Sequence, residues 1–148
     1  MKKIFLAIIL VAFASSLFAQ TAKSKTLKNN VAAREHKVVI QLSSEDTLVH
    51  KSLLRQLNNI LTAAPGSKIE VVCHGPGINM LVTDKTTVHS KIEEMKIKGV
   101  LFMACENTLR ERNISKDKII PGAGFVPSAL VEIITRQEEG WSYIKSGF

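Results

Sequence analysis

Residues 101–109 read "LFMACENTL", and this stretch decides the fold class. It begins as a short apolar run, which is typical of a buried strand, and it turns polar directly after Cys105. The polar residues that follow favour a helix, so the stretch marks a strand-to-helix junction. An apolar strand followed by a helix is the repeating unit of an α/β protein.

The same alternation recurs on both sides of this junction. The sequence predicts strands at 36–43, 68–74, 100–104, 125–126 and 141–145, and helices at 47–63, 87–98, 107–112 and 127–139. Five strands that alternate with helices predict an α/β fold with a mainly parallel sheet and helices on both faces. Apolar residues at three- and four-residue spacing are expected to face the sheet: Val49, Leu53, Leu57, Ile60, Leu61, Val88, Ile92, Met95, Leu130, Ile133 and Ile134.

Residues 1–19 have the layout of a secretory signal peptide. Two lysines precede an unbroken apolar run at 4–14, and small residues up to Ala19 provide a cleavage site. We therefore expect a periplasmic or secreted protein, with no stable membrane span after cleavage. An uncleaved N-terminal anchor is the alternative, although the apolar run is shorter than the roughly 20 residues that a span needs.

A basic leader, residues 20–35, precedes a domain at 36–148. Much of the formal net charge of +7 lies at 21–34, which holds four basic residues and neither an acid nor an aromatic. Single-stranded nucleic acid is usually bound by basic residues together with aromatic side chains that stack on bases. We therefore expect a solvated leader and no nucleic-acid partner. The domain itself is long enough for one hydrophobic core.

Cys105 is the candidate catalytic residue. At a strand-to-helix junction, Asn107 or Thr108 is expected to cap the following helix, which would bring free N–H groups close to the sulfur. Such groups favour the thiolate, which is the nucleophilic form of cysteine. Glu106 opposes this effect with its negative charge. The alternative is a structural cysteine that ends a buried strand, because free cysteines are among the most buried residues.

In parallel α/β sheets, sites gather beyond the carboxyl ends of the strands. The segments 43–46, 74–78 and 105–108 are expected at this edge. The second segment begins with His74 and Gly75, which become candidate supporting residues for the cysteine. Histidine and cysteine are acceptable ligands for copper or zinc. Because the chain has no C-x-x-C or H-x-x-x-H spacing, we predict no metal site and no cofactor.

Cys73 lies in the second predicted strand and is expected to pack inside the protein. Two cysteines in an exported protein suggest a disulfide. A common strand order for such sheets, however, is 2-1-3-4-5. In that order, the first strand would separate Cys73 from Cys105. Their Cα atoms would then be roughly 10 Å apart at about 4.8 Å per strand, beyond the limit of about 7 Å. We therefore expect no disulfide between them, and a role for Cys73 as a resolving thiol after local movement stays open.

The other histidines are expected to have structural or surface roles. His50 shares a helix face with leucines and is expected to be packed, whereas His36 and His89 are expected at the surface. Three aromatic residues near the C-terminus are expected in the core or in subunit contacts: Phe125, Trp141 and Tyr143.

Four blocks of the chain resemble the DsrE/DsrF-like sulfur-relay family. They are "KVVIQLSS" (37–44), "HGPGINML" (74–81), "GVLFMACENTLRERNI" (99–114) and "VPSALVEIITRQEEGWSYIK" (126–145). The resemblance implies a flavodoxin-like three-layer sandwich that assembles into trimers or hexamers. It also places Cys105 at the position where sulfur-carrying members accept sulfur as a persulfide and pass it to another thiol.

Two functions follow as expectations. The first is an exported DsrE-like protein that carries sulfane sulfur on Cys105, supported by His74, Gly75, Asn107 and Thr108, with thiol-bearing donor and acceptor proteins. The second is a non-catalytic oligomeric binding or scaffold protein in which the cysteine is structural. The apolar pair at 125–126 is expected to be buried in a neighbouring subunit.

Overall fold

The computed structural model describes residues 35–147. The predicted signal peptide and the leader up to Arg34 lie outside the described residues. The strands are β1 (Lys37–Leu42), β2 (Lys68–Cys73), β3 (Leu101–Cys105), β4 (Gly124–Val126) and β5 (Ser142–Ser146). The helices are α2 (Thr47–Ala63), α3 (His89–Ile97), α4 (Glu106–Glu111) and α5 (Ala129–Glu138), with 3-10 turns η1 (Gly75–Met80) and η2 (Lys116–Lys118). No helix within this range is long and apolar enough to cross a membrane.

The five strands form one sheet in the order β4-β3-β2-β1-β5, and every neighbouring pair is parallel. The α/β class is confirmed, but the expected order 2-1-3-4-5 is wrong. The chain adds β2, β3 and β4 successively on one side of β1, and α5 then carries it back to the opposite side, where β5 pairs with β1. As a result, β2 and β3 are direct neighbours.

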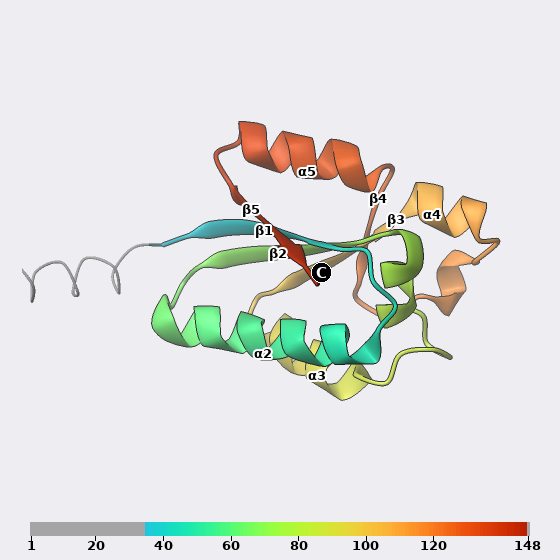
Figure 1. Cartoon of the computed structure of the whole chain (residues 1–148), viewed down its shortest axis with the longest axis horizontal. Coiled ribbons are helices and arrows are strands. Elements are labelled where there is room, and N and C mark those ends of the chain that lie inside the picture. The colour runs from blue at the N-terminus through green and yellow to red at the C-terminus, as the bar shows by residue number, and fades with distance from the viewer. Residues whose placement is uncertain (1–34, 148) are drawn as a thin grey trace, which may run out of the picture. The chain divides into compact units, whose positions relative to one another are not determined.

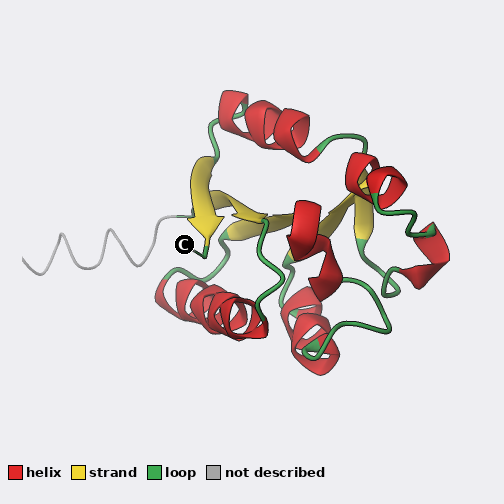
Figure 2. Ribbon diagram, turned by 45° about the vertical axis from the view of Figure 1, so that its right-hand side comes forward, coloured by secondary structure: helices red, strands yellow, loops and turns green. Residues whose placement is uncertain are grey.

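The molecule has the three layers of a flavodoxin-like sandwich. Helices α2 and α3 cover one face of the sheet, and α5 lies across the other (Figure 1). Turning the molecule shows the same separation, with the sheet between the two helical layers (Figure 2). Covering both faces is what a parallel sheet requires, because its strands are apolar on both sides.

The two faces bury unequal cores. The larger core lies between the sheet and α2 with α3, and includes Leu53, Leu57, Ile92 and Met95. The predicted inward faces of these two helices are therefore confirmed. His50 is also buried, as expected, and its ring Nε2 lies 2.8 Å from the carbonyl oxygen of Ser44. A much smaller cluster lies under α5.

Helix α5 differs from the prediction in its start and in its orientation. It begins at Ala129, directly after the N-cap residue Ser128, and not at position 127. Ile133 is buried as predicted, but Leu130 and Ile134 are 59% and 53% exposed. The face toward the sheet carries Ala129, Ile133 and the partly buried Arg136, at spacings of four and three residues.

Arg136 faces the sheet because a buried carboxylate lies there. Glu70, in the middle of β2, is 0% exposed, and its Oε2 lies 2.7 Å from Arg136 Nη2 and 2.9 Å from Nε. Arg136 also pairs with Glu132 at 2.9 Å and stacks on the Trp141 ring. Burial raises the pKa of Glu70, and Arg136 offsets this only in part. The second oxygen, Oε1, has no partner within residues 35–147.

Candidate functional site

The three predicted edge segments meet at the carboxyl ends of β1, β2 and β3. His74 donates its backbone N–H to the carbonyl of Leu42 at 3.0 Å. Gly77, one turn later, passes so close to β1 that an added Cβ would lie 2.3 Å from the Leu42 oxygen. The backbone of η1 therefore lies directly against the end of β1, and only a glycine fits at this contact.

Cys105 ends β3 on the α5 side of the sheet. Cys105 is only 3% exposed. It packs in a small apolar cluster with Val39, Val72, Val126, Ala129 and Ile133. The backbone N–H of Ala129 donates to the sulfur at 3.3 Å. This N–H belongs to the first residue of α5, so the positive end of that ten-residue helix faces Cys105.

The expected capping of the helix that follows Cys105 is wrong. Helix α4 follows Cys105 directly, has only six residues, and makes no side-chain cap hydrogen bond. Cys105 is itself the N-cap residue, which leaves Asn107 and Thr108 inside the helix, where they cannot cap it. The helix that the chain forms later, α5, supplies the contact instead.

Asn107 and Thr108 still belong to the site, with different roles. The backbone N–H of Asn107 donates to the carbonyl of Pro127 at 3.3 Å, and its side-chain oxygen accepts from Arg110. The buried Thr108 hydroxyl accepts the backbone N–H of Gly75 at 3.0 Å. These contacts join α4 to the turn before α5 and to the end of β2.

The negative charge beside Cys105 is balanced. Glu106 pairs with Lys116, whose ammonium also lies 4.9 Å from the centre of the Phe125 ring. Glu106 therefore disfavours a thiolate on Cys105 less than the sequence indicates, because its negative charge is paired with the cation of Lys116.

Both cysteines are free thiols, for a reason that differs from the expected one. Strands β2 and β3 are adjacent, and Cys73 lies opposite Ala104 in their register. Cys105 is the next residue and therefore lies on the other face of the sheet. Cys73 is completely buried on the α2 side, and burial raises the pKa of its thiol well above the ordinary value.

His74 lies on the same face as Cys105. Continuing the β2–β3 register by one residue places His74 opposite Cys105. Its ring Nε2 lies 2.7 Å from Gln41 Nε2, and Tyr143 donates its hydroxyl to Gln41 Oε1. Burial lowers the pKa of His74. Sequence reasoning missed Gln41, although a polar residue inside the apolar β1 was a visible signal.

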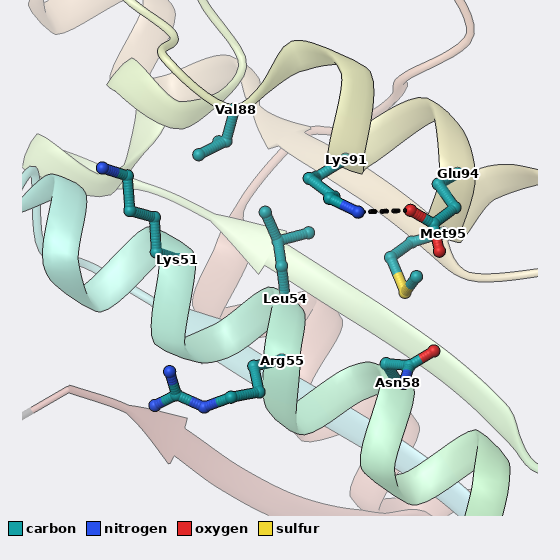
Figure 3. Close-up of a pocket in the computed structure, with 8 residues that line it drawn as sticks. All are labelled: Lys51, Leu54, Arg55, Asn58, Val88, Lys91, Glu94 and Met95. Carbon is teal, nitrogen blue, oxygen red and sulfur yellow. Dashed lines mark hydrogen bonds and ion pairs between the residues drawn. The ribbon is translucent and has the colours of Figure 1, made fainter.

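A cavity of about 340 Å³ lies between α2 and α3, on the face of the sheet opposite Cys105. Figure 3 shows Lys51, Arg55 and Lys91 around it, with the apolar Leu54 between them and Met95 beside Glu94. None of the predicted site residues lines this cavity. Across residues 35–147, no three histidine, cysteine or acidic side chains are grouped closely enough to hold a metal ion.

Solved structures resemble this fold closely. MTH1491, a protein of unknown function from Methanobacterium thermoautotrophicum, is 32% identical with a TM-score of 0.72, and the match covers 75% of this chain and 99% of that one. BT1422, a conserved protein of unknown function from Bacteroides thetaiotaomicron, has a TM-score of 0.60 at 16% identity, over 80% and 97% of the chains. The second likeness concerns the fold alone.

Sequence comparison gives the family. No curated protein matches the chain significantly. The sequence profile of the DsrE/DsrF-like family, however, matches residues 7–146, which is nearly the whole chain and includes every strand and helix of the structure. The protein therefore belongs to the DsrE/DsrF-like family.

Proposed function

We propose that Cys105 accepts a sulfane sulfur as a persulfide and passes it to the thiol of another molecule. Family membership suggests a function of the sulfur-relay type. The observation that carries the proposal is the Ala129 N–H, which donates to the Cys105 sulfur at 3.3 Å from the first turn of α5. A backbone donor at a helix N-terminus favours a negatively charged sulfur.

The chemistry needs only this thiol and two partners. The Cys105 thiolate attacks the outer sulfur of a donor persulfide, R–S–SH. A new S–S bond forms on Cys105, the S–S bond of the donor breaks, and the donor leaves as a thiolate that takes up the proton released by the new persulfide. An acceptor thiolate then attacks the outer sulfur on Cys105 and restores its thiolate. No electrons are gained or lost overall.

The setting of this transfer is also a proposal. The signal-peptide layout of residues 1–19 supports export to the periplasm or beyond. Donor and acceptor would then be thiol-bearing proteins of that compartment, and the chain would act as a homo-oligomer, a trimer or a hexamer.

The burial of Cys105 favours a second candidate. A residue only 3% exposed within an aliphatic cluster is typical of a structural cysteine. The chain would then be an oligomeric binding or scaffold protein. Sulfur transfer, by contrast, requires the donor molecule to reach the sulfur past the aliphatic side chains that pack around it.

Alkylation of the native protein separates the two candidates. In a Cys73→Ala background, the wild-type Cys105 is treated with polysulfide at neutral pH and then with an alkylating agent, and the intact mass is measured. Sulfur transfer predicts that Cys105 gains a whole sulfur atom in the folded state and that a reductant removes it. Cys105→Ser is the control. If Cys105 reacts only after the protein unfolds, sulfur transfer is excluded and the scaffold function remains.

A further inference from the structure

Three polar side chains lead across the sheet toward Cys105. Tyr143 lies opposite Val39 in the β1–β5 register, so Tyr143 and Gln41 share the α5 face. His74 follows on the next strand, and the register places it opposite Cys105. The row therefore runs from the edge strand β5 through β1 and β2 to β3, along one face and near the carboxyl ends of the strands.

The hydrogen bonds along this row fix the proton on His74. The Tyr143 hydroxyl donates to Gln41 Oε1, which turns the amide nitrogen of Gln41 toward His74. An amide nitrogen is only a donor, so His74 Nε2, at 2.7 Å, must accept. A neutral imidazole that accepts at Nε2 carries its proton on Nδ1.

The row is only partly buried, so solvent reaches both of its ends. Tyr143 is 40% exposed, so water can serve its hydroxyl, and His74 is itself only partly buried. The hydrogen bond from Gln41 occupies Nε2, the acceptor nitrogen of His74. The Nδ1–H of the ring is then free to donate to another group. That N–H belongs to the residue that lies opposite the proposed sulfur carrier.

We propose that Gln41, held by Tyr143, is a positioning residue that keeps His74 in its Nδ1–H tautomer, and that this N–H binds the outer sulfur of a persulfide on Cys105. The inference rests on the proposed function. In Cys–S–S⁻ the outer sulfur carries the charge, whereas the inner sulfur already accepts from Ala129. His74 would supply the second donor, and it transfers no proton in the step.

The tautomer is tested first, without any sulfur chemistry. NMR of isotope-labelled histidine distinguishes a protonated from an unprotonated ring nitrogen. His74 is expected to carry its proton on Nδ1 in the wild type. Gln41→Glu offers only acceptors, so in the neutral ring it should move the proton to Nε2 and leave Nδ1 without one. The exposed Gln56→Leu on α2 is the matched control and should leave the proton on Nδ1. A wild-type proton on Nε2 overturns the positioning role.

Persulfide lifetime is tested second. After loading with polysulfide, the persulfide should be lost roughly tenfold to a hundredfold faster in Gln41→Glu and His74→Phe, the range for one hydrogen bond to a charged group. Gln56→Leu should match the wild type, and circular dichroism checks that each variant folds. Equal lifetimes in all variants overturn the inference but leave the proposed function standing. A wild type that takes up no sulfur overturns the proposed function. The tautomer measurement still tests whether Gln41 keeps the proton of His74 on Nδ1.

Discussion

At the scale of the residue, Glu70 is the most unusual group in the sheet. It is a carboxylate at the centre of β2, completely buried, with one oxygen bound to Arg136 and the other without a partner within residues 35–147. Burying a charge in a sheet costs free energy unless pairing and hydrogen bonds compensate it fully. The partial compensation here makes the stability of the protein depend on the protonation of this one group.

We expect Glu70→Gln to change the pH dependence of stability. Burial, with Glu132 nearby, raises the pKa of Glu70 above its ordinary value of 4.5, despite Arg136. In the window above 4.5, the folded state therefore keeps a proton that the unfolded state has lost, so this group's contribution to the free energy of unfolding falls as pH rises. Glu70→Gln removes that contribution.

Urea unfolding of the wild type and Glu70→Gln from about pH 4.5 to about pH 8 measures this effect. The wild type should lose stability relative to the variant as pH increases. The difference between the two proteins isolates Glu70 from the other carboxylates, which titrate in both. A difference that stays constant, or that grows in favour of the wild type with rising pH, would contradict the expectation.

At the scale of the element, η1 fixes the geometry of the edge. Gly77 lies against the backbone of β1, where an added Cβ would be 2.3 Å from the Leu42 oxygen. Backbone on both sides cannot yield as a side chain can. Gly124 offers a matched comparison, because its added Cβ would meet only the flexible end of Met103, at 2.6 Å.

We therefore expect Gly77→Ala to destabilise the protein by about 3 kcal/mol or more, near or above the upper range for overpacking. Gly124→Ala should cost about 1 kcal/mol, because the thioether can move aside. Thermal and urea unfolding of the two variants beside the wild type measures both values. Equal losses would mean that η1 adapts and does not hold the edge rigidly.

The elements also show what sequence alone can predict. Helix α2 has one clear apolar stripe, and α3 buries the predicted Ile92 and Met95, so the buried faces of both were predicted correctly. Helix α5 has two stripes with four-residue spacing, Ala129 with Ile133 and Leu130 with Ile134. The choice between them depends on Arg136 and Glu70, which are 66 residues apart. Local periodicity does not contain that pairing.

The same limit applies to the candidate site. The position of Cys105 at a strand end followed from a local change in polarity. Its hydrogen-bond donor Ala129 is 24 residues away, and the Gln41–Tyr143 contact joins residues 102 positions apart. Both depend on the order of strands in the sheet. A local pattern defines each strand, but it does not say on which side of β1 the next strand pairs.

At the scale of the whole molecule, the outer face of α5 is apolar and uncovered in the single chain. Leu130, Val131 and Ile134 are all more than half exposed. Contiguous exposed apolar surface of this kind marks interaction sites. It supports the proposal that the chain forms homo-oligomers, with this face as a contact between subunits. The expected contact through residues 125–126 is wrong for Val126, which is buried within its own chain.

We expect the double substitution Leu130→Glu and Ile134→Glu to shift the protein to monomers at micromolar concentration, because charges would replace the apolar contact. Sedimentation equilibrium of the wild type and the variant measures the masses. Ile97→Glu, at a residue that is 87% exposed on α3, is the control and should leave the assembly unchanged. A wild type with the mass of one chain would contradict the proposed assembly.

The placement of the two thiols on opposite faces of one sheet has a consequence for any sulfur bound at Cys105. A second thiol in the same chain commonly discharges a persulfide by forming an internal disulfide, and here the sheet itself separates the two sulfurs. Cys73 is also sealed within the larger core. A persulfide on Cys105 would therefore have no second thiol of the same chain to react with. It would last until the thiol of another molecule attacks it.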